Sequence, residues 1–285
     1  MKPFIILQYL LPKNLLSRLV GLFAEGTLFK KLLIKTFIMR YKVDMSEALI
    51  QDINQFENFN DFFTRALKKN ARYIENIPGV IVCPTDGVVS QLGNIEDDKI
   101  LQAKGHNYSL IELLGGDLDI AESFRSGSFA TIYLAPKDYH RVHMPLAGTL
   151  KKVIYVPGSL FSVNRVTAEH VPNLFTRNER AVCYFNSEAG PMAMILVGAM
   201  IVAGIETVWS GQICPNQGLR KVQSTNYENK NPAIELAAGS EMGRFKLGST
   251  VIVLFGHGAV TLDKNLSVSS GVKMGQKLGQ LNATL

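Results

Sequence analysis

Three residue types that together cleave peptide bonds lie far apart in this 285-residue chain. A serine follows a glycine at Gly248-Ser249, and an acid lies within Thr85-Asp86-Gly87. Two of the five histidines, His140 and His143, are three residues apart. A serine, a histidine and an aspartate that are distant in sequence can act together only when the fold joins them. The motifs therefore predict a serine-dependent reaction and a fold that unites three segments.

The pair Gly248-Ser249 permits an attack on its own backbone. A serine hydroxyl can attack the carbonyl carbon of the preceding residue and turn the amide into an ester, and glycine gives the backbone the freedom that this approach needs. His143, oriented by Asp86, would take the hydroxyl proton. Loss of the serine α-proton then breaks the chain by elimination. Hydrolysis of the resulting dehydroalanine leaves a pyruvoyl group, so the sequence predicts a covalent cofactor made from Ser249.

A pyruvoyl group has a defined use. Its carbonyl condenses with a primary amine to a Schiff base, which withdraws electrons from the amine-bearing carbon. A carboxylate on that carbon can leave as carbon dioxide, and the carbanion must then be protonated. A histidine that titrates near neutral pH is a natural proton donor, and His140 is the candidate. These steps predict a decarboxylase of an amino compound.

Each motif also has an ordinary explanation. Gly-Ser and Thr-Asp-Gly are common turns, and two histidines three residues apart could hold a metal. However, the chain has no HExxH motif and no obvious third ligand, so we expect no metal site. The three cysteines, Cys83, Cys183 and Cys214, form no CxxC pair and indicate neither a zinc ribbon nor a disulfide framework. The joint occurrence of the motifs favours the self-cleaving chemistry.

The positive charge of the chain is concentrated at its N-terminus. Residues 1–42 hold eight Lys or Arg and one acid, whereas the remainder is nearly neutral, which argues against a nucleic-acid partner. Apolar residues recur at helical spacing over 15–23 and 28–37. No run approaches the roughly 18–20 apolar residues of a spanning helix. We expect helices that lie in the interface of an anionic membrane; the alternative is that they pack on the protein body.

The remaining sequence indicates how the reactive residues are positioned. Residues 45–75 are predicted to be polar and helical. From about residue 78, short β-branched and aromatic runs alternate with turn residues, which predicts strands at 80–82, 130–134, 150–156, 193–197 and 251–255. The expected fold is α+β, with a helical membrane-associating region at 1–75 and a β-rich catalytic domain at 76–285.

The motifs, taken in order, resemble those of the phosphatidylserine decarboxylases of the bacterial membrane-associated type. The resemblance covers nearly the whole chain, and its most specific segments are Tyr139-His140-Arg141-Val142-His143-Met144-Pro145 and Met242–Thr250. Further matching segments are 59–65, 84–87, 104–110, 133–138, 157–164, 173–180 and 197–199. Met200 and Gly256-His257-Gly258 depart from the family pattern, but neither removes a group that the mechanism needs.

The resemblance implies a set of roles. The precursor would cut itself between Gly248 and Ser249 into chains of residues 1–248 and 249–285. Ser249 would become the pyruvoyl group, with Asp86 and His143 completing the self-cleavage triad. His140 would assist decarboxylation and protonation, and Phe161, Ser162 and Asn164 would line the substrate pocket.

The resemblance also implies a substrate and a location. The substrate would be phosphatidylserine, converted to phosphatidylethanolamine and carbon dioxide on the cytoplasmic face of the bacterial cell membrane, where the protein would be peripheral. Members of the family tend to dimerise. Two other functions stay open: a pyruvoyl-dependent decarboxylase of an amino acid or another serine-linked lipid, and a non-catalytic lipid-binding module.

Overall fold

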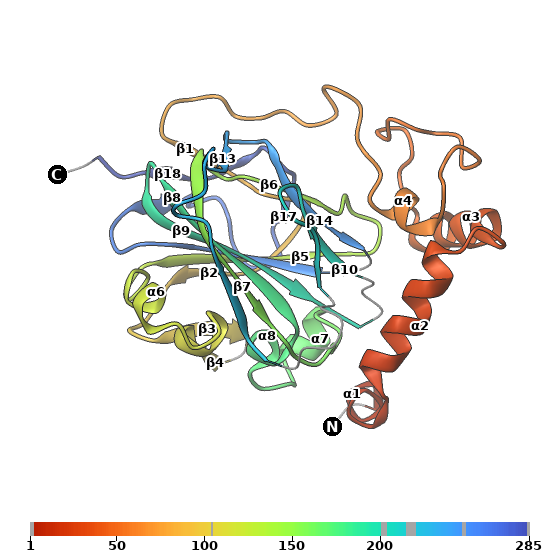
Figure 1. The fold of residues 1–285 in the computed structure, drawn as a ribbon, viewed down its shortest axis with the longest axis horizontal. Helices are drawn as coiled ribbons and strands as arrows, with labels where there is room; N and C mark the ends of the chain where they lie inside the picture. Colours follow the sequence, from red (N-terminus) through yellow and green to blue (C-terminus); the bar gives the residue numbers. More distant parts are fainter. Residues whose placement is uncertain (1–2, 104, 201–203, 215–220, 247–248, 284–285) are drawn as a thin grey trace.

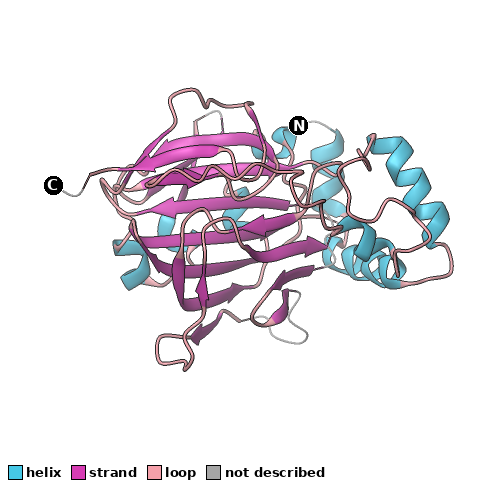
Figure 2. Cartoon of the chain, turned by 90° about the horizontal axis from the view of Figure 1, so that it is seen from above, coloured by secondary structure: helices cyan, strands magenta, loops and turns pink. Residues whose placement is uncertain are grey.

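A computed structural model of the chain describes residues 3–103, 105–200, 204–214, 221–246 and 249–283. Helices at the N-terminus lie to one side of a body built from β-sheets (Figure 1). The same separation is visible from above, where the strands run side by side and the longer helices gather at one end (Figure 2). The described residues therefore have the predicted α+β class.

Helices form two groups. The N-terminal group comprises α1 (Pro3–Leu10), α2 (Lys13–Glu25), α3 (Lys30–Tyr41) and α4 (Phe59–Phe63). Helices α2, α3 and α4 pack around an apolar cluster that includes Phe56, Phe62 and Phe63, whereas Ile5 of α1 joins the core of the body. The second group covers one face of the body and comprises α5 (Leu110–Leu113), α6 (Leu118–Glu122), α7 (Arg165–Ala168) and α8 (Leu174–Arg177). Among the described residues, no helix is both long enough and apolar enough to cross a membrane.

The prediction of helix across residues 45–75 is wrong for most of that segment. Only the five residues of α4 are helical, and the rest forms turns and a short bridge. Asp and Asn side chains explain the difference, because they bond nearby backbone N–H groups and compete with a helix. Asp44 accepts from the N–H of Ser46, and Asp52 accepts from the N–H of Asn54. Ser46 itself lies in such a turn.

The body is centred on one large sheet. Its strand order is β12-β7-β8-β9-β15-β5-β2-β17, with β13 also paired to β7. Smaller sheets have the orders β11-β10-β14-β6, β1-β18-β16 and β3-β4. The strands are β1 (Val80–Val82), β2 (Gly87–Asn94), β3 (Lys99–Ala103), β4 (His106–Ser109), β5 (Ser128–Leu134), β6 (Arg141–His143), β7 (Gly148–Val156), β8 (Arg180–Ser187), β9 (Gly190–Gly198), β10 (Gly204–Thr207), β11 (Gly211–Cys214), β12 (Gln223–Asn226), β13 (Glu235–Leu236), β14 (Glu241–Lys246), β15 (Ser249–Phe255), β16 (Val260–Leu262), β17 (Gly271–Val272) and β18 (Lys277–Leu281). The five predicted strands are confirmed.

Strand β15 lies in the middle of the large sheet, between β5 and β9, and all seven of its residues are buried. Successive side chains of a strand point to opposite faces. Ile252 and Leu254 join the core under the short helices, whereas Val251 and Val253 join the core shared with β6, β10 and β14. By the same alternation, the side chain of Ser249 faces the core shared with β6, β10 and β14. Pairing with β5 and β9 holds both edges of the strand that begins at Ser249.

Candidate active site

Ser249 is the first residue of β15 and is fully buried. Its strand partners are Leu134 at the end of β5 and Gly198 at the end of β9. Among the described residues, no hydrogen-bond partner lies within reach of its Oγ. A buried hydroxyl without a partner is uncommon, because desolvation is then uncompensated. Gly248, the other half of the expected cleavage site, lies outside the described residues.

His140 lies beside the strand end that holds Ser249. The chain leaves β5 after Leu134, and the next residue, Ala135, accepts a hydrogen bond from Nε2 of His140 at 3.1 Å. The ring of Phe63 stacks on the imidazole, with 4.1 Å between ring centroids. His140 is fully buried, and its Nδ1 has no partner in the described structure.

This environment sets the charge of His140. Burial lowers the pKa of His140 to about 3, and the nearby positive charge of Arg65 acts in the same direction. The sequence-based expectation that this histidine has a pKa near neutral pH is wrong. The structure holds a neutral imidazole instead, since the ring is removed from water.

His143, at the end of β6, uses both ring nitrogens. Nδ1 lies 2.8 Å from the carbonyl oxygen of Gly239, and Nε2 lies 3.0 Å from the hydroxyl of Tyr139. A carbonyl only accepts, so Nδ1 carries the proton and Nε2 accepts from Tyr139. Burial lowers the pKa of His143. The ring is therefore held as a neutral acceptor whose basic nitrogen faces a tyrosine.

Asp86 lies on a neighbouring segment but is bonded to other groups. The backbone N–H of His143 donates to the carbonyl of Pro84 at 2.8 Å, which places the two segments side by side. The Asp86 carboxylate accepts from Nε of Arg72 at 2.9 Å and from the N–H of Met274 at 2.9 Å. Asp86 and His143 thus share one region, but the structure shows no hydrogen bond from either to the other or to Ser249.

Close packing against β5 explains why a glycine follows Asp86 in Thr85-Asp86-Gly87. Gly87 has a φ of 156°, and a Cβ there would lie 2.3 Å from the carbonyl oxygen of Tyr133. Only glycine tolerates this close approach of β2 to β5. The motif therefore fixes Asp86 directly before β2, which is separated from β15 by β5.

The segment with Phe161, Ser162 and Asn164 reaches the same strand end. The amide of Asn178 donates to the carbonyls of Phe161 and Gly198, each at 2.8 Å, and Gly198 is the strand partner of Ser249. The side chains, however, have structural partners.

Phe161 is 1% exposed and lies 4.7 Å from the guanidinium of Arg177. Asn164 caps α7 by accepting from the N–H of Thr167. The backbone N–H of Ser162 donates to Gln8 of α1 at 2.8 Å. Contact of these side chains with a substrate stays a prediction.

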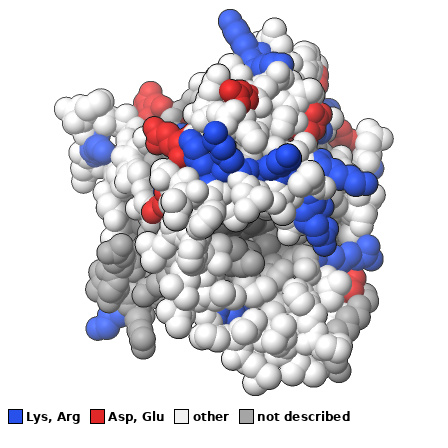
Figure 3. Space-filling view, turned by 90° about the vertical axis from the view of Figure 1, so that its right-hand side faces the viewer, with Lys and Arg blue, Asp and Glu red and all other residues white. Residues whose placement is uncertain are grey.

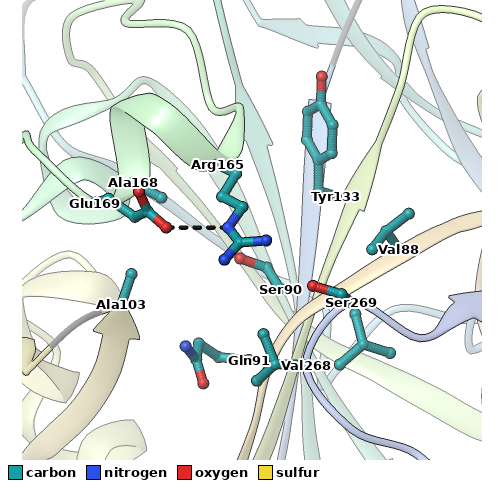
Figure 4. A pocket seen from close by; sticks show the side chains of 11 residues that line it. Val88, Ser90, Gln91, Ala103, Tyr133, Arg165, Ala168, Glu169, Val268 and Ser269 are labelled. Carbon is teal, nitrogen blue, oxygen red and sulfur yellow. Dashed lines mark hydrogen bonds and ion pairs between the residues drawn. The ribbon is translucent and has the colours of Figure 1, made fainter. Parts of the chain in front are cut away.

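A cavity of about 210 Å³ lies on the helix-covered face of the sheet. Its wall includes Tyr133, which pairs with Thr250, and an ion pair of 3.0 Å between Arg165 and Glu169 (Figure 4). Because Thr250 and Ser249 alternate, the cavity is on the opposite side of the sheet from the serine side chain. Within the described ranges, no group of three or more His, Cys, Asp and Glu residues could hold a metal ion.

Sequence analysis did not identify several residues that contact the candidate site. Arg65 and Tyr139 lie within segments that carried the resemblance, so their motifs could have drawn attention to them. Arg72 and Gln8 are in no motif that we recognised. Their partners are distant in sequence, and only the folded chain reveals them.

Comparison with known proteins identifies the family. Residues 59–280 match the family model described as phosphatidylserine decarboxylase, and residues 3–42 match the model described as PSD. The chain is 59% identical over 280 residues to a phosphatidylserine decarboxylase proenzyme of Ectopseudomonas mendocina, covering 97% of each chain. Proteins of the same name from Pseudomonas entomophila and Pseudomonas aeruginosa are each 58% identical over 278 residues, covering 96% of each chain. The chain therefore belongs to the phosphatidylserine decarboxylase family.

Proposed function

We propose that this protein is a self-processing decarboxylase that converts phosphatidylserine to phosphatidylethanolamine and carbon dioxide through a pyruvoyl group formed from Ser249. The observation that carries the proposal is the position of Ser249: a buried serine with an unbonded hydroxyl, at the start of the central strand and beside His140. The similarity to proteins named as proenzymes, over 97% of the chain, supports it.

Ser249 fits the group that it would form. A serine that attacks its own backbone needs a hydroxyl that no structural hydrogen bond already occupies, and Oγ of Ser249 meets this need. Strand pairing on both sides would hold the new chain end in place after cleavage. The pyruvoyl carbonyl would supply an electron sink for the amine-bearing carbon of the substrate. The described residues would bind, orient and move protons around it.

In self-cleavage, the hydroxyl of Ser249 attacks the carbonyl carbon of Gly248 and His143 receives its proton. Nδ1 of His143 holds its proton against Gly239, so Nε2 is the acceptor. Tyr139 occupies this nitrogen, and the attack requires Tyr139 to move or to pass the proton on. Asp86 would act on His143 through its charge, because Arg72 and Met274 already hold its carboxylate.

In decarboxylation, His140 would assist at the amine-bearing carbon. It is the histidine nearest the strand end in the chain of contacts from Ser249 through Leu134 and Ala135. Its Nδ1 has no partner in the described structure and can bond to a substrate group. The stacked ring of Phe63 excludes water from one side of the imidazole.

The N-terminal helices would bind the membrane surface from the cytoplasmic side. Leu10, Leu22, Phe23 and Leu28 are 68–85% exposed. Figure 3 shows the side of these helices as a largely uncharged surface with a band of Lys and Arg beside it. Exposed apolar side chains next to cations match the interface of an anionic bilayer. The predicted peripheral location and membrane-associating region at 1–75 rest on this pattern.

Two measurements test the proposal. The purified protein, given phosphatidylserine labelled in its carboxyl group, should release labelled carbon dioxide and form phosphatidylethanolamine; absence of both products would refute the function. In flotation, it should rise with anionic liposomes, and Phe23→Ser with Leu28→Ser should weaken this. Failure of the wild type to float would refute the membrane assignment.

A further inference from the structure

Arg65 is a buried cation with unused hydrogen-bond donors. It follows α4 by two residues and is 4% exposed. Its Nη2 donates to the carbonyls of Lys137 at 3.1 Å and Asp138 at 3.4 Å. Its Nε and Nη1 have no partner in the described structure. Burial of a charge is unfavourable unless ion pairs and hydrogen bonds compensate it, and here compensation is incomplete.

A second buried arginine shows what complete compensation looks like. Arg180 is 1% exposed, and each of its three nitrogens donates to a backbone carbonyl. The acceptors are Leu113, Glu112, Thr176 and Asn178. The fold can therefore satisfy a buried guanidinium with backbone groups alone. At Arg65 it leaves two of the three nitrogens free.

The free nitrogens lie in the neighbourhood of His140. Arg65 bonds to the two carbonyls that precede Tyr139 and His140, and Phe63, two residues before Arg65, stacks on the His140 ring. Nδ1 of His140 also has no partner in the described structure. Unbonded polar atoms of Arg65 and His140 thus lie in neighbouring segments of the region where the proposed reaction occurs.

The carboxylates near Arg65 form hydrogen bonds with other groups. Asp86 and Asp138 attract the guanidinium over a distance. Asp86, however, is bonded to Arg72 and Met274, and Asp138 accepts from the N–H of Ala135 at 2.7 Å. Neither forms an ion pair with Arg65 among the described residues. The site has a positive charge and donors, and it lacks an oxyanion to match them.

We propose that Arg65 binds an oxyanion of the phosphatidylserine headgroup beside His140. This inference rests on the proposed function. Two groups of that headgroup share the required chemistry, the phosphodiester and the carboxylate, and both accept charge-assisted hydrogen bonds from a guanidinium. The bound oxyanion would bond to Nε or Nη1 and bring the amine-bearing carbon to His140. The neutral His140 would gain an anionic neighbour only when substrate is present.

The test compares Arg65→Gln and Arg65→Lys with the wild type. Processed enzymes are assayed with short-chain phosphatidylserine in neutral detergent micelles, which separates KM from kcat. Loss of charge-assisted hydrogen bonds in Arg65→Gln should raise KM by about 10- to 100-fold. Arg65→Lys should recover part of the loss. Arg125→Gln, which removes an exposed arginine paired to Asp97 and Glu122, is the control and should leave KM unchanged.

Two amine-free inhibitors identify the oxyanion. Glycerophosphoglycerol offers a phosphodiester, and glycerate offers a carboxylate. The group that Arg65 binds is the one whose inhibition of the wild type is weakened in both variants.

If KM and both inhibition constants in Arg65→Gln equal those of the wild type, the proposal is overturned; should Arg65→Gln fail to fold, the same equality in Arg65→Met overturns it. In that outcome the proposed function is retained, because the wild type still decarboxylates phosphatidylserine. A wild type without that activity would overturn the proposed function itself.

Discussion

Two buried polar regions of this protein differ in how completely their groups are bonded. Under the short helices, Gln102 donates to the carbonyls of Ala168 and Val171 and accepts from the N–H of Leu174, each at 2.8 Å. Asn178 and Arg180 are bonded as fully. Around the start of β15, unbonded side-chain atoms occur on the buried residues Arg65, His140 and Ser249, and α4 holds a fourth such residue, Asn60.

The difference indicates that buried polar residues of this fold have two uses, structural support and chemistry. A buried polar group that only supports structure stabilises the fold when its bonds are made, and it destabilises the fold when they are not. The helix-covered region follows this rule at Gln102, Asn178 and Arg180, and its unpartnered groups include the hydroxyls of Tyr108 and Thr250. In the second region Asn60 has no proposed role, whereas Arg65, His140 and Ser249 have proposed roles in substrate binding, decarboxylation and cleavage. We infer that their unbonded donors and acceptors serve reacting groups.

The largest expected effect comes from Ser249→Ala. This change removes the hydroxyl that attacks the backbone, so cleavage should stop completely and the chain should run as one band on a denaturing gel. Ser267→Ala, at an exposed serine, should cleave like the wild type. Cleavage of Ser249→Ala at the wild-type rate would show that the unbonded hydroxyl has no part in maturation.

His140→Ala should separate the two reactions. Cleavage should be largely intact, whereas turnover of phosphatidylserine should fall roughly 100-fold or more, as when a residue that transfers protons is lost. The gel and the carbon dioxide assay measure the two effects on the same sample. A parallel fall in cleavage and turnover would contradict the assignment of His140 to decarboxylation alone.

Asn178 and Asn60 provide a matched pair, since both are buried and only one is bonded. Asn178→Ala removes three hydrogen bonds and leaves the backbone N–H of Phe161 without its partner, so the free energy of unfolding should fall by about 3 kcal/mol. Asn60→Ala removes no side-chain hydrogen bond and should change it by less than about 1 kcal/mol. Urea denaturation of uncleaved Ser249→Ala backgrounds measures both. Equal decreases in the free energy of unfolding for the two variants would contradict the proposed difference between the two regions.

A smaller effect concerns pH. The pKa of His140 is lowered to about 3 in the folded protein, whereas an unfolded histidine titrates near 6.5. Below about pH 6.5 the unfolded chain binds more protons, so the free energy of unfolding should decrease as pH falls toward 3. His140→Gln should remove up to about 1.4 kcal/mol per pH unit of this slope.

Denaturation between about pH 7 and pH 5 measures the slope, and the range lies just around and below the unfolded pKa. His143, whose pKa is also lowered, contributes in the same direction and is retained in both proteins. His257→Gln, at an exposed histidine, is the control. An unchanged slope in His140→Gln would show that the burial of this imidazole has no effect on stability.

The sequence predicted the sheet better than it predicted the contacts within the site. Runs such as 130–134 and 251–255 are β-branched and apolar on both faces, which is typical of central strands, and they pair as neighbours. Residues 45–75 were wrongly expected to be helical, because Asp and Asn turns override a weak helical pattern.

The membership of the site stays a prediction, and the hydrogen bonds of its residues were not foreseen. Spacing and motif chemistry indicated Asp86, His140, His143 and Ser249, yet the contacts of Asp86 with Arg72 and of His143 with Tyr139 depend on the packing of distant segments. Burial of His140 under Phe63 likewise arises only in the folded chain. Pairings of this kind have no local signature, so sequence reasoning did not find them.

Intact-mass measurement of the purified, active protein tests the central claim most directly. If Ser249 becomes the pyruvoyl group, the sample contains two polypeptides, and the smaller one spans residues 249–285 with a keto group in place of its N-terminal amine. A single chain of 285 residues with an unmodified serine, in protein that decarboxylates phosphatidylserine, would contradict it.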